Sequence, residues 1–439
     1  MPDSVAPLDY AVADPDDKPP LDLGVRLRLS VLMFVQFAVW GAWFTVFNIY
    51  CDKTLHFTGT QIGSIYGTMA LGAILSMMVA GQIADRFISS EYILAVSHLL
   101  GAGLLLAMSQ LHSFPALWWT TLAYALVYNP TLAVANSISF ANVPDATRDF
   151  PTLRVLGTLG WIAAGLTVGR LLPHGSAETN RPLIMAAVLS VGLGVFCFFL
   201  PHTPPRRKHG DAIPFLRAFA LLRDPSFGVF FGISFVITIA LAFYFGFAGV
   251  FFNDIGVTDV ASTMTIGQAS EIFFMLILGI ALMKFGMKWV LGIGMAAWAV
   301  RYGLFSIGHP FVLIVIGIAL HGVCFDFFLA AGFIHTDKKA PASIRGSAQG
   351  LFSFLTYGVG MWIGNQISGW VVDHYTVDHV KHWSSIWLVP AVGAAACLAL
   401  FLLLWRDTPG KLEGEPEIRG FEPMIAVGTD VGTVGQAIP

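Results

Sequence analysis

Charged residues are scarce in this chain of 439 residues. Asp, Glu, Lys and Arg make up only 12% of the sequence, hydrophobic residues make up 56%, and the mean hydropathy is +0.72. A soluble globular domain carries about 25% charged residues, so the composition excludes an ordinary water-soluble protein. The apolar runs are long and unbroken, which argues against the short alternating segments of a transmembrane β-barrel. The remaining class is an all-α membrane protein that crosses the bilayer many times.

Cysteine and net positive charge are also limited. The four cysteines are far apart and form no C-x-x-C pair, so we expect small buried side chains and neither a disulfide nor a metal site. The net charge of −3 implies no nucleic-acid partner. The sequence contains no H-E-x-x-H, no G-x-S-x-G and no cluster of histidines, so an enzyme is not expected and no cofactor is implied.

The apolar runs predict twelve membrane-spanning helices, each about 20 residues or longer. Their expected ranges are 27–50, 60–83, 92–111, 116–141, 151–172, 183–201, 226–252, 261–284, 288–307, 310–333, 347–372 and 384–405. With the N-terminus in the cytoplasm, the loops and tails place 18 Lys and Arg residues inside and 4 outside. This asymmetry predicts an integral protein of the plasma (inner) membrane with both termini cytoplasmic.

The longest internal loop divides six spans from six. We therefore expect two six-helix halves, repeated around a site near the middle of the bilayer, in a protein that works as a monomer. The expected divisions are a disordered cytoplasmic tail (1–26), an N-terminal bundle (27–201), a cytoplasmic linker (202–225), a C-terminal bundle (226–405) and a cytoplasmic tail (406–439).

A short motif lies between the second and third spans. Gly81, Asp85 and Arg86 form the pattern G-x-x-x-D-R, in which the glycine lets two helices approach closely and the charged pair ends a helix. The motif resembles the signature loop of the major facilitator superfamily, and this likeness implies the twelve-helix fold of that superfamily and a structural or gating role for the three residues. The alternative is a simple charged turn.

Four charged residues are expected in the middle of spans: Arg154, Glu271, Arg301 and Asp326. Each costs about 2.5–3.5 kcal/mol at a helix centre, so each must be paired or must line a wet cavity. Two cations and two anions could form ion pairs that only hold helices together. We expect a functional site at Arg154 and Glu271. Arg301 is expected to have a structural or gating role.

Helical spacing groups further side chains with these charges. Arg154, Thr158 and Trp161 follow at i, i+4 and i+7 and so share one face of a helix. Gln268 and Glu271, at i and i+3, form a second polar stripe. A cation, a hydroxyl, an indole, an amide and a carboxyl are groups that suit a polar ligand with a ring.

The tenth expected span carries a third group. His321 and Phe325 share a face at i and i+4, and Asp326 follows. A carboxyl in a dry cavity can hold a proton near neutral pH, so Glu271 and Asp326 are alternative candidates for proton coupling. His321 is more simply a hydrogen-bonding residue of a cavity, although a histidine can also titrate.

At these residues the chain resembles the nucleoside:H⁺ symporter family of the major facilitator superfamily, and in particular a branch of it whose members are little characterised. The matching stretches cover residues 36–43, 130–132, 136–139, 149–158, 268–271, 301–303, 325–328 and 345–350. The resemblance extends over about residues 27–405.

The resemblance implies roles for individual residues. It assigns nucleoside contacts to Arg154, Thr158, Gln268 and Glu271, and it places Trp161 where an aromatic ring stacks on the base. It also aligns Phe325 with an aromatic residue of the site.

The chain departs from the known carriers of that family at two places. Their seventh span has a Gln and an Asn one turn apart, where this chain offers Phe243 and Gly246, and His321 replaces a tyrosine. These departures leave the identity of the base or sugar open.

The expected function is thus proton-coupled nucleoside uptake by alternating access, with nucleoside, protons and the lipid bilayer as the partners. The alternative is a transporter of the same fold for another small polar solute, a sugar or a drug, which could act as an exporter. A membrane-embedded enzyme and a receptor without flux are further alternatives with less support.

Overall fold

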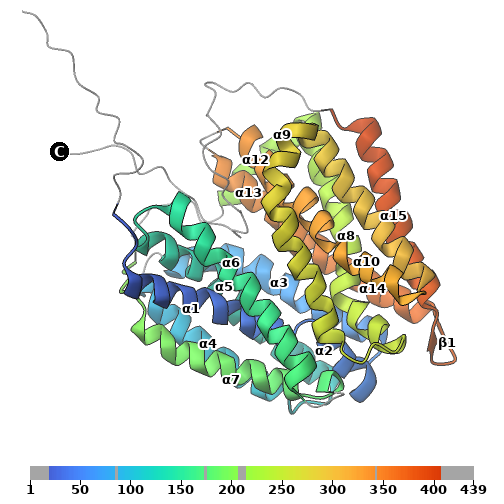
Figure 1. The fold of residues 1–439 in the computed structure, drawn as a ribbon, viewed down its shortest axis with the longest axis horizontal. Helices are drawn as coiled ribbons and strands as arrows, with labels where there is room; N and C mark the ends of the chain where they lie inside the picture. Colours follow the sequence, from blue (N-terminus) through green and yellow to red (C-terminus); the bar gives the residue numbers. More distant parts are fainter. Residues whose placement is uncertain (1–18, 85–87, 173–175, 206–213, 342–343, 407–439) are drawn as a thin grey trace, which may run out of the picture.

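The computed structural model describes residues 19–84, 88–172, 176–205, 214–341 and 344–406, and almost all of them are helical (Figure 1). We call the first group of elements the N-terminal half. It contains α1 (Leu23–Gly41), α2 (Phe47–Ile49), η2 (Tyr50–Thr54), α3 (Gly59–Ala84), α4 (Ser90–Met108), α5 (Phe114–Asn142), α6 (Ala146–Leu166), η3 (Thr167–Leu171), η4 (Ser176–Glu178), α7 (Arg181–Phe196) and η5 (Cys197–Phe199).

The elements that follow η6 (Pro214–Arg223) form the C-terminal half. It contains α8 (Pro225–Asp254), α9 (Val260–Ile307), α10 (Phe311–Ala319), α11 (His321–Cys324), η7 (Phe325–Ala330), α12 (Ala331–Lys339), α13 (Arg345–Ser353), η9 (Phe354–Gly360), α14 (Met361–His374), β1 (Thr376–Val377), β2 (Val380–Lys381) and α15 (Trp383–Leu404). The strands β1 and β2 form one antiparallel hairpin.

The expected all-α class is confirmed, and each of the twelve expected spans lies on helical segments. Within the described residues, eight stretches are long and apolar enough to cross a membrane. One of them, α9, covers the eighth and ninth expected spans together. Gly286 interrupts it with a φ of 75° and a ψ of 165°, a conformation that suits glycine, so α9 consists of two helices joined at this residue. The count of twelve spans stays a prediction.

The first expected span is not one continuous helix, and this part of the prediction is wrong. The helix α1 ends at Gly41, and the chain becomes helical again only at Phe47. Tyr66 of α3 stabilises the break, because its hydroxyl donates to the Phe44 carbonyl and accepts a hydrogen bond from the Asn48 amide. Irregular backbone at this depth is possible only where such partners exist.

Each half is a bundle with its own close packing. In the N-terminal half α1 packs on α6 and α3 on α5, and in the C-terminal half α15 packs on α9 and α14 on α8. Figure 1 shows the two halves in contact near the β1–β2 hairpin and α2. The halves diverge toward the start of α1 and the end of α15. We call the side of the molecule that carries the hairpin the hairpin side.

Close backbone contacts between the halves lie on the hairpin side. The start of α3 meets the end of α14 at backbone distance, where a Cβ added to Gly63 would lie 2.2 Å from the Asn365 carbonyl oxygen. A Cβ on Gly369 would lie 2.5 Å from the Gly59 carbonyl oxygen. We call this contact the glycine seam. Between the described residues of the two halves, the hydrogen bonds and ion pairs also lie toward this side.

Some expectations fall beyond the described structure. Of the expected signature motif, Gly81 lies in the last turn of α3, whereas Asp85 and Arg86 are outside the described residues. Most of the two expected tails, residues 1–18 and 407–439, is likewise outside them.

Candidate functional site

The helix α6 presents Arg154, Thr158 and Trp161 at the middle of the N-terminal half. The helix lies very close to α1, because a Cβ on Gly160 would stand only 2.0 Å from the Phe34 carbonyl oxygen. Arg154 is 6% exposed, and its guanidinium carbon lies 4.2 Å from the centre of the Phe37 ring. Its Nε makes no hydrogen bond within the described structure. A buried cation with a free donor is therefore available to a ligand.

Aromatic rings connect the two halves beside this cation. Trp161 meets Phe44 with ring centres 6.4 Å apart, Phe44 meets Phe245 at 5.7 Å, and Phe245 meets His321 at 6.4 Å. The rings of His321 and Phe325 follow at 5.7 Å. Trp161, Phe245 and Phe325 are only partly buried. The structure thus brings the predicted aromatic residues of α6 and η7 into one chain of contacts.

The helix α9 supplies the facing polar groups. Glu271 is partly buried and interacts electrostatically with Arg154 across the two halves, but the two side chains form no direct ion pair. Gln268, one turn earlier, is 6% exposed, and its Oε1 has no hydrogen-bond partner among the described residues. Unsatisfied buried polar groups are costly, so these groups favour a polar ligand between the halves.

Asp326 lies deeper in the C-terminal half, in the π-helical segment η7. Its side chain is fully buried, and within the described chain neither carboxyl oxygen has a hydrogen-bond partner. It interacts electrostatically with Glu271. Wide helical turns of this kind occur often at functional sites. A buried carboxyl without a cation partner is stable when it carries a proton.

Arg301 does not form the ion pair that the balance of charges allowed. Its Nη1 lies 2.9 Å from Nδ1 of His321, and its guanidinium carbon lies 3.6 Å from the centre of the Tyr244 ring. No carboxylate of the described structure lies within ion-pair distance of Arg301. The reason is packing, because α9 and α11 run side by side and place Arg301 beside His321 and away from Asp326.

The two residues of α8 that differ from the known carriers, Phe243 and Gly246, have structural roles. Phe243 is 2% exposed and belongs to the hydrophobic core. Gly246 offers its backbone carbonyl to Asn48 of α2, whose Nδ2 donates at 3.0 Å, and a second carbonyl at Phe245 accepts at 3.3 Å. This part of α8 therefore closes the contact between the halves and presents no amide side chain.

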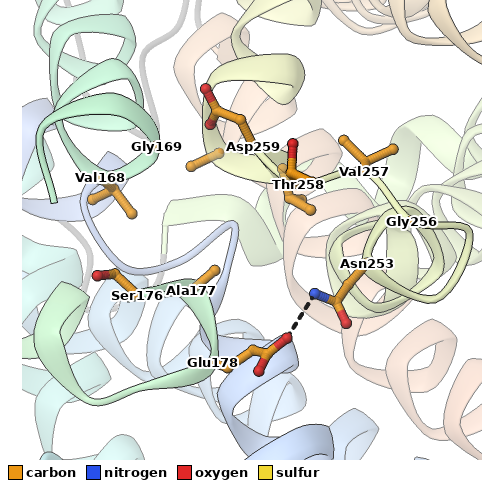
Figure 2. Close-up of a pocket in the computed structure, with 12 residues that line it drawn as sticks. Val168, Gly169, Ser176, Ala177, Glu178, Asn253, Gly256, Val257, Thr258 and Asp259 are labelled. Carbon is orange, nitrogen blue, oxygen red and sulfur yellow. Dashed lines mark hydrogen bonds between the residues drawn. The ribbon is translucent and has the colours of Figure 1, made fainter. Parts of the chain in front are cut away.

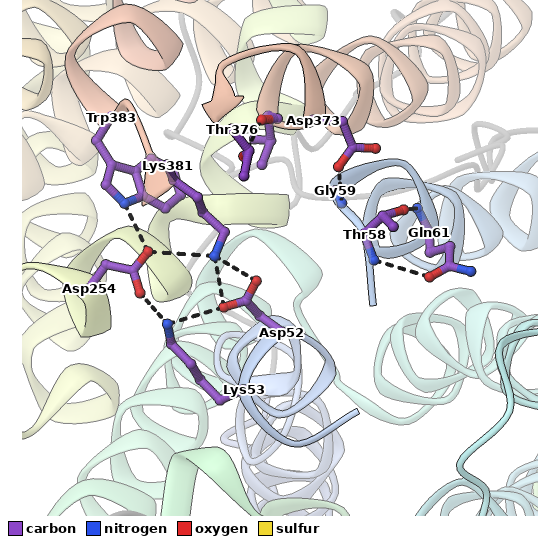
Figure 3. A network of polar contacts seen from close by, with 11 residues as sticks. Asp52, Lys53, Thr58, Gly59, Gln61, Asp254, Asp373, Thr376, Lys381 and Trp383 are labelled. Carbon is purple, nitrogen blue, oxygen red and sulfur yellow. Dashed lines mark hydrogen bonds and ion pairs between the residues drawn. The ribbon is translucent and has the colours of Figure 1, made fainter. Parts of the chain in front are cut away.

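A polar network on the hairpin side joins the halves, and sequence reasoning missed it (Figure 3). Lys381 lies 2.8 Å from Asp52, and Lys53 pairs with Asp254. Burial acts to lower the pKa of Lys53, but hydrogen bonding and charge from Asp254 and Asp52 outweigh it and raise that pKa above its usual value. The indole of Trp383 also donates to Asp254. We call these five residues the hairpin-side network.

A pocket of about 590 Å³ also lies between the halves on the hairpin side, away from the predicted site (Figure 2). The ends of η3, η4 and α8 and the start of α9 line it. Asn253 donates to Glu178 across it at 3.1 Å. No sequence motif marked these residues, because they come from two separate connections, α6 to α7 and α8 to α9. No group of three metal-ligating side chains occurs in the described part of the chain.

Comparison with known proteins identifies the group to which this arrangement belongs. The chain matches the family described as "Nucleoside H+ symporter" over residues 23–409. The chain belongs to this family. It is therefore an integral membrane transporter, and its expected family resemblance is confirmed.

Individual relatives agree with this assignment. The YegT protein of Escherichia coli (strain K12) is 41% identical over 404 residues, which are 88% of this chain and 95% of that protein. The xanthosine permease of the same organism is 32% identical over 89% of this chain and 99% of its own length.

A solved structure confirms the fold class. The crystal structure of the nucleoside transporter NupG matches with a TM-score of 0.80 and 31% identity, over 87% of this chain and 98% of that one. The family member is thus a transporter with the fold of the major facilitator superfamily.

Proposed function

We propose that this symporter-family member takes up nucleosides together with protons, by alternating access of its two halves. The observation that carries the proposal is the pair Arg154 and Glu271, which interact across the halves without a direct ion pair. A nucleoside between them supplies hydroxyl and base groups that satisfy both. The family match favours nucleosides over the alternative of a sugar or drug transporter.

The substrate contacts follow the chemistry of each side chain. Arg154 and Thr158 donate to hydroxyl or carbonyl oxygens, Gln268 and Glu271 accept from the ribose hydroxyls, and Trp161 stacks on the base. A stacked aromatic ring contributes about 1–3 kcal/mol per base in nucleic-acid complexes. His321 and Phe325 bound the site from the C-terminal half.

Proton coupling is assigned to the two carboxyls of the C-terminal half. Glu271 lies at the contact with the N-terminal half, so its protonation changes the attraction between the halves. Asp326 lies behind it in an environment without a counter-charge among its described neighbours. A proton on either carboxyl removes an uncompensated charge before the site moves across the bilayer.

The orientation follows from the loop charges. The hairpin side faces the outside, the termini lie in the cytoplasm, and the protein resides in the inner membrane as a monomer. Because the halves meet on the hairpin side, the structure corresponds to a state closed to the outside.

The test uses the full-length chain in proteoliposomes with an imposed pH gradient. Radiolabelled uridine and inosine should accumulate above equilibrium, and a protonophore should abolish accumulation. Glu271→Gln should lose gradient-driven accumulation, because the amide cannot carry the proton.

Glu91→Gln is the matched control. Glu91 accepts hydrogen bonds from His202 and the Thr203 amide, away from the site, so the variant should transport normally. Full accumulation by Glu271→Gln would overturn its role in coupling. Absence of uptake and of binding for all nucleosides tested would overturn the proposed function itself.

A further inference from the structure

The hydrogen bond between Arg301 and His321 determines where the imidazole carries its proton. Every nitrogen of a guanidinium is a donor, and the group has no acceptor. The short contact of 2.9 Å therefore requires that Nδ1 of His321 accepts. A doubly protonated imidazole has no free acceptor, so the ring is neutral and its proton is on Nε2.

The surroundings hold this arrangement in place. Arg301 is fully buried, and its guanidinium carbon lies 3.6 Å from the centre of the Tyr244 ring in a cation–π contact. Tyr244 in turn stacks on the His321 ring, with centres 5.2 Å apart and an angle of 28° between the planes. One edge of the imidazole is thus fixed by Arg301, which has no acceptor, and one face by the stacked ring of Tyr244.

The Nε2–H of His321 has no acceptor in the described structure. The residue is 2% exposed. Its other neighbours are the partly buried rings of Phe245 and Phe325, which belong to the aromatic chain between the halves. A donor that no described residue satisfies is free to bond an acceptor atom of a ligand in the site.

We propose that Arg301 is a positioning residue that makes His321 a permanent hydrogen-bond donor, and that the site consequently prefers nucleosides whose base presents a carbonyl oxygen. This inference rests on the proposed function. The aromatic neighbours of His321 suit a flat base, whereas the ribose finds its polar partners at Arg154 and Glu271. An amino group at the same position of the base would place its N–H donor opposite the Nε2–H donor of His321, and such mismatches reduce binding strongly.

The test compares two pairs of nucleosides that differ by an oxo or an amino group: uridine with cytidine, and inosine with adenosine. Dissociation constants are measured by competition with radiolabelled uridine on the purified full-length protein. In both pairs the oxo member should bind at least tenfold more tightly. His321→Phe keeps the ring but lacks the donor, so it should reduce this ratio to below threefold.

Two substitutions separate positioning from simple structural support. Arg301→Lys keeps an obligatory donor opposite Nδ1 and should preserve the ratio. Arg301→Gln can accept as well as donate, so His321 can adopt either tautomer and the ratio should fall. The control His98→Gln alters a buried histidine that bonds Gln36 in the N-terminal half, and it should leave the ratio unchanged.

Nitrogen NMR of the imidazoles gives a readout that does not depend on transport. The His321 signal, identified by its loss in His321→Phe, should show an unprotonated Nδ1 and a protonated Nε2 at pH 7. A mixture of tautomers or an imidazolium would overturn the positioning role. An unchanged oxo preference in His321→Phe would overturn the specificity. The expected tautomer together with no binding of any nucleoside would instead refute the proposed function.

Discussion

The hairpin-side network offers a direct test of how the two halves are held closed. Lys381→Met removes the ammonium but keeps a chain of similar length. The lost pair joins Lys381, which is 16% exposed, to Asp52, which is 9% exposed, through contacts of 2.8 and 3.0 Å to the two carboxyl oxygens. The substitution should weaken the closed state and increase the population that is open on the hairpin side.

The magnitude follows from the burial of this pair. Exposed ion pairs contribute about 0.2–1 kcal/mol, whereas breaking a fully buried pair costs about 3–5 kcal/mol. The Lys381–Asp52 pair lies between these limits, so we expect the closed state to lose about 1–2 kcal/mol of stability. The open state is not affected, because the two halves are separated there and the pair is already broken. This corresponds to a shift of about 5- to 30-fold in the conformational equilibrium.

Pulsed electron paramagnetic resonance can measure this shift. Spin labels are placed at Ser113 and Asp378, which are exposed on the hairpin side of the N-terminal and C-terminal halves. The longer distance should become more populated in Lys381→Met. The matched control is Lys288→Met, since Lys288 donates only to carbonyls of α15 and its C-cap within its own half. An equal distance distribution in wild type and Lys381→Met would refute the reasoning.

Three further predictions follow from packing, stacking and charge. Gly160→Ala should lower the free energy of unfolding by about 1–3 kcal/mol, because its methyl would overlap the Phe34 carbonyl, whereas Gly103→Ala in open space should be neutral or stabilising in thermal melts. Trp161→Ala should weaken uridine binding about fivefold or more in a competition assay, and unchanged affinity would exclude stacking there. Competitive acetylation should show Lys53 titrating above pH 10.5, its usual pKa. The ion pairs of Lys53 therefore stabilise the closed state fully at neutral pH, and this stabilisation is lost only as the pH rises through the raised pKa. Titration at or below pH 10.5 would contradict this prediction.

The sequence predicts the helices and the two polar stripes because both depend on local spacing. Arg154 and Trp161 share a face at any tertiary arrangement of α6, and Glu271 and Gln268 do so on α9. That the two stripes face each other across the halves could be predicted only from the resemblance to a family, since no local rule relates positions more than 100 residues apart.

The contacts that the sequence did not predict are all long-range. The Arg301–His321 bond depends on how α9 and α11 align, and charge counting suggested an ion pair instead. The hairpin-side network joins side chains from the start of the chain, its middle and its end, among them Asp52, Asp254 and Lys381. From the sequence alone, Lys381 is only one of the four Lys and Arg residues expected outside the membrane. The break after Gly41 was missed because Tyr66 replaces the lost helical hydrogen bonds without changing the apolar pattern.

The glycine seam has a mechanical consequence. Gly59, Gly63 and Gly369 bring backbone against backbone between α3 and α14. The side-chain hydrogen bonds at this point are those of the Asp373 carboxylate, which accepts from the amides of Gly59 and Thr60. Once the Asp373 hydrogen bonds are released, one helix can roll over the other, and the core of each half can remain intact during the motion. A single added methyl would act as a wedge there. Such a variant could fold normally and still be trapped with its substrate site facing only one side of the membrane.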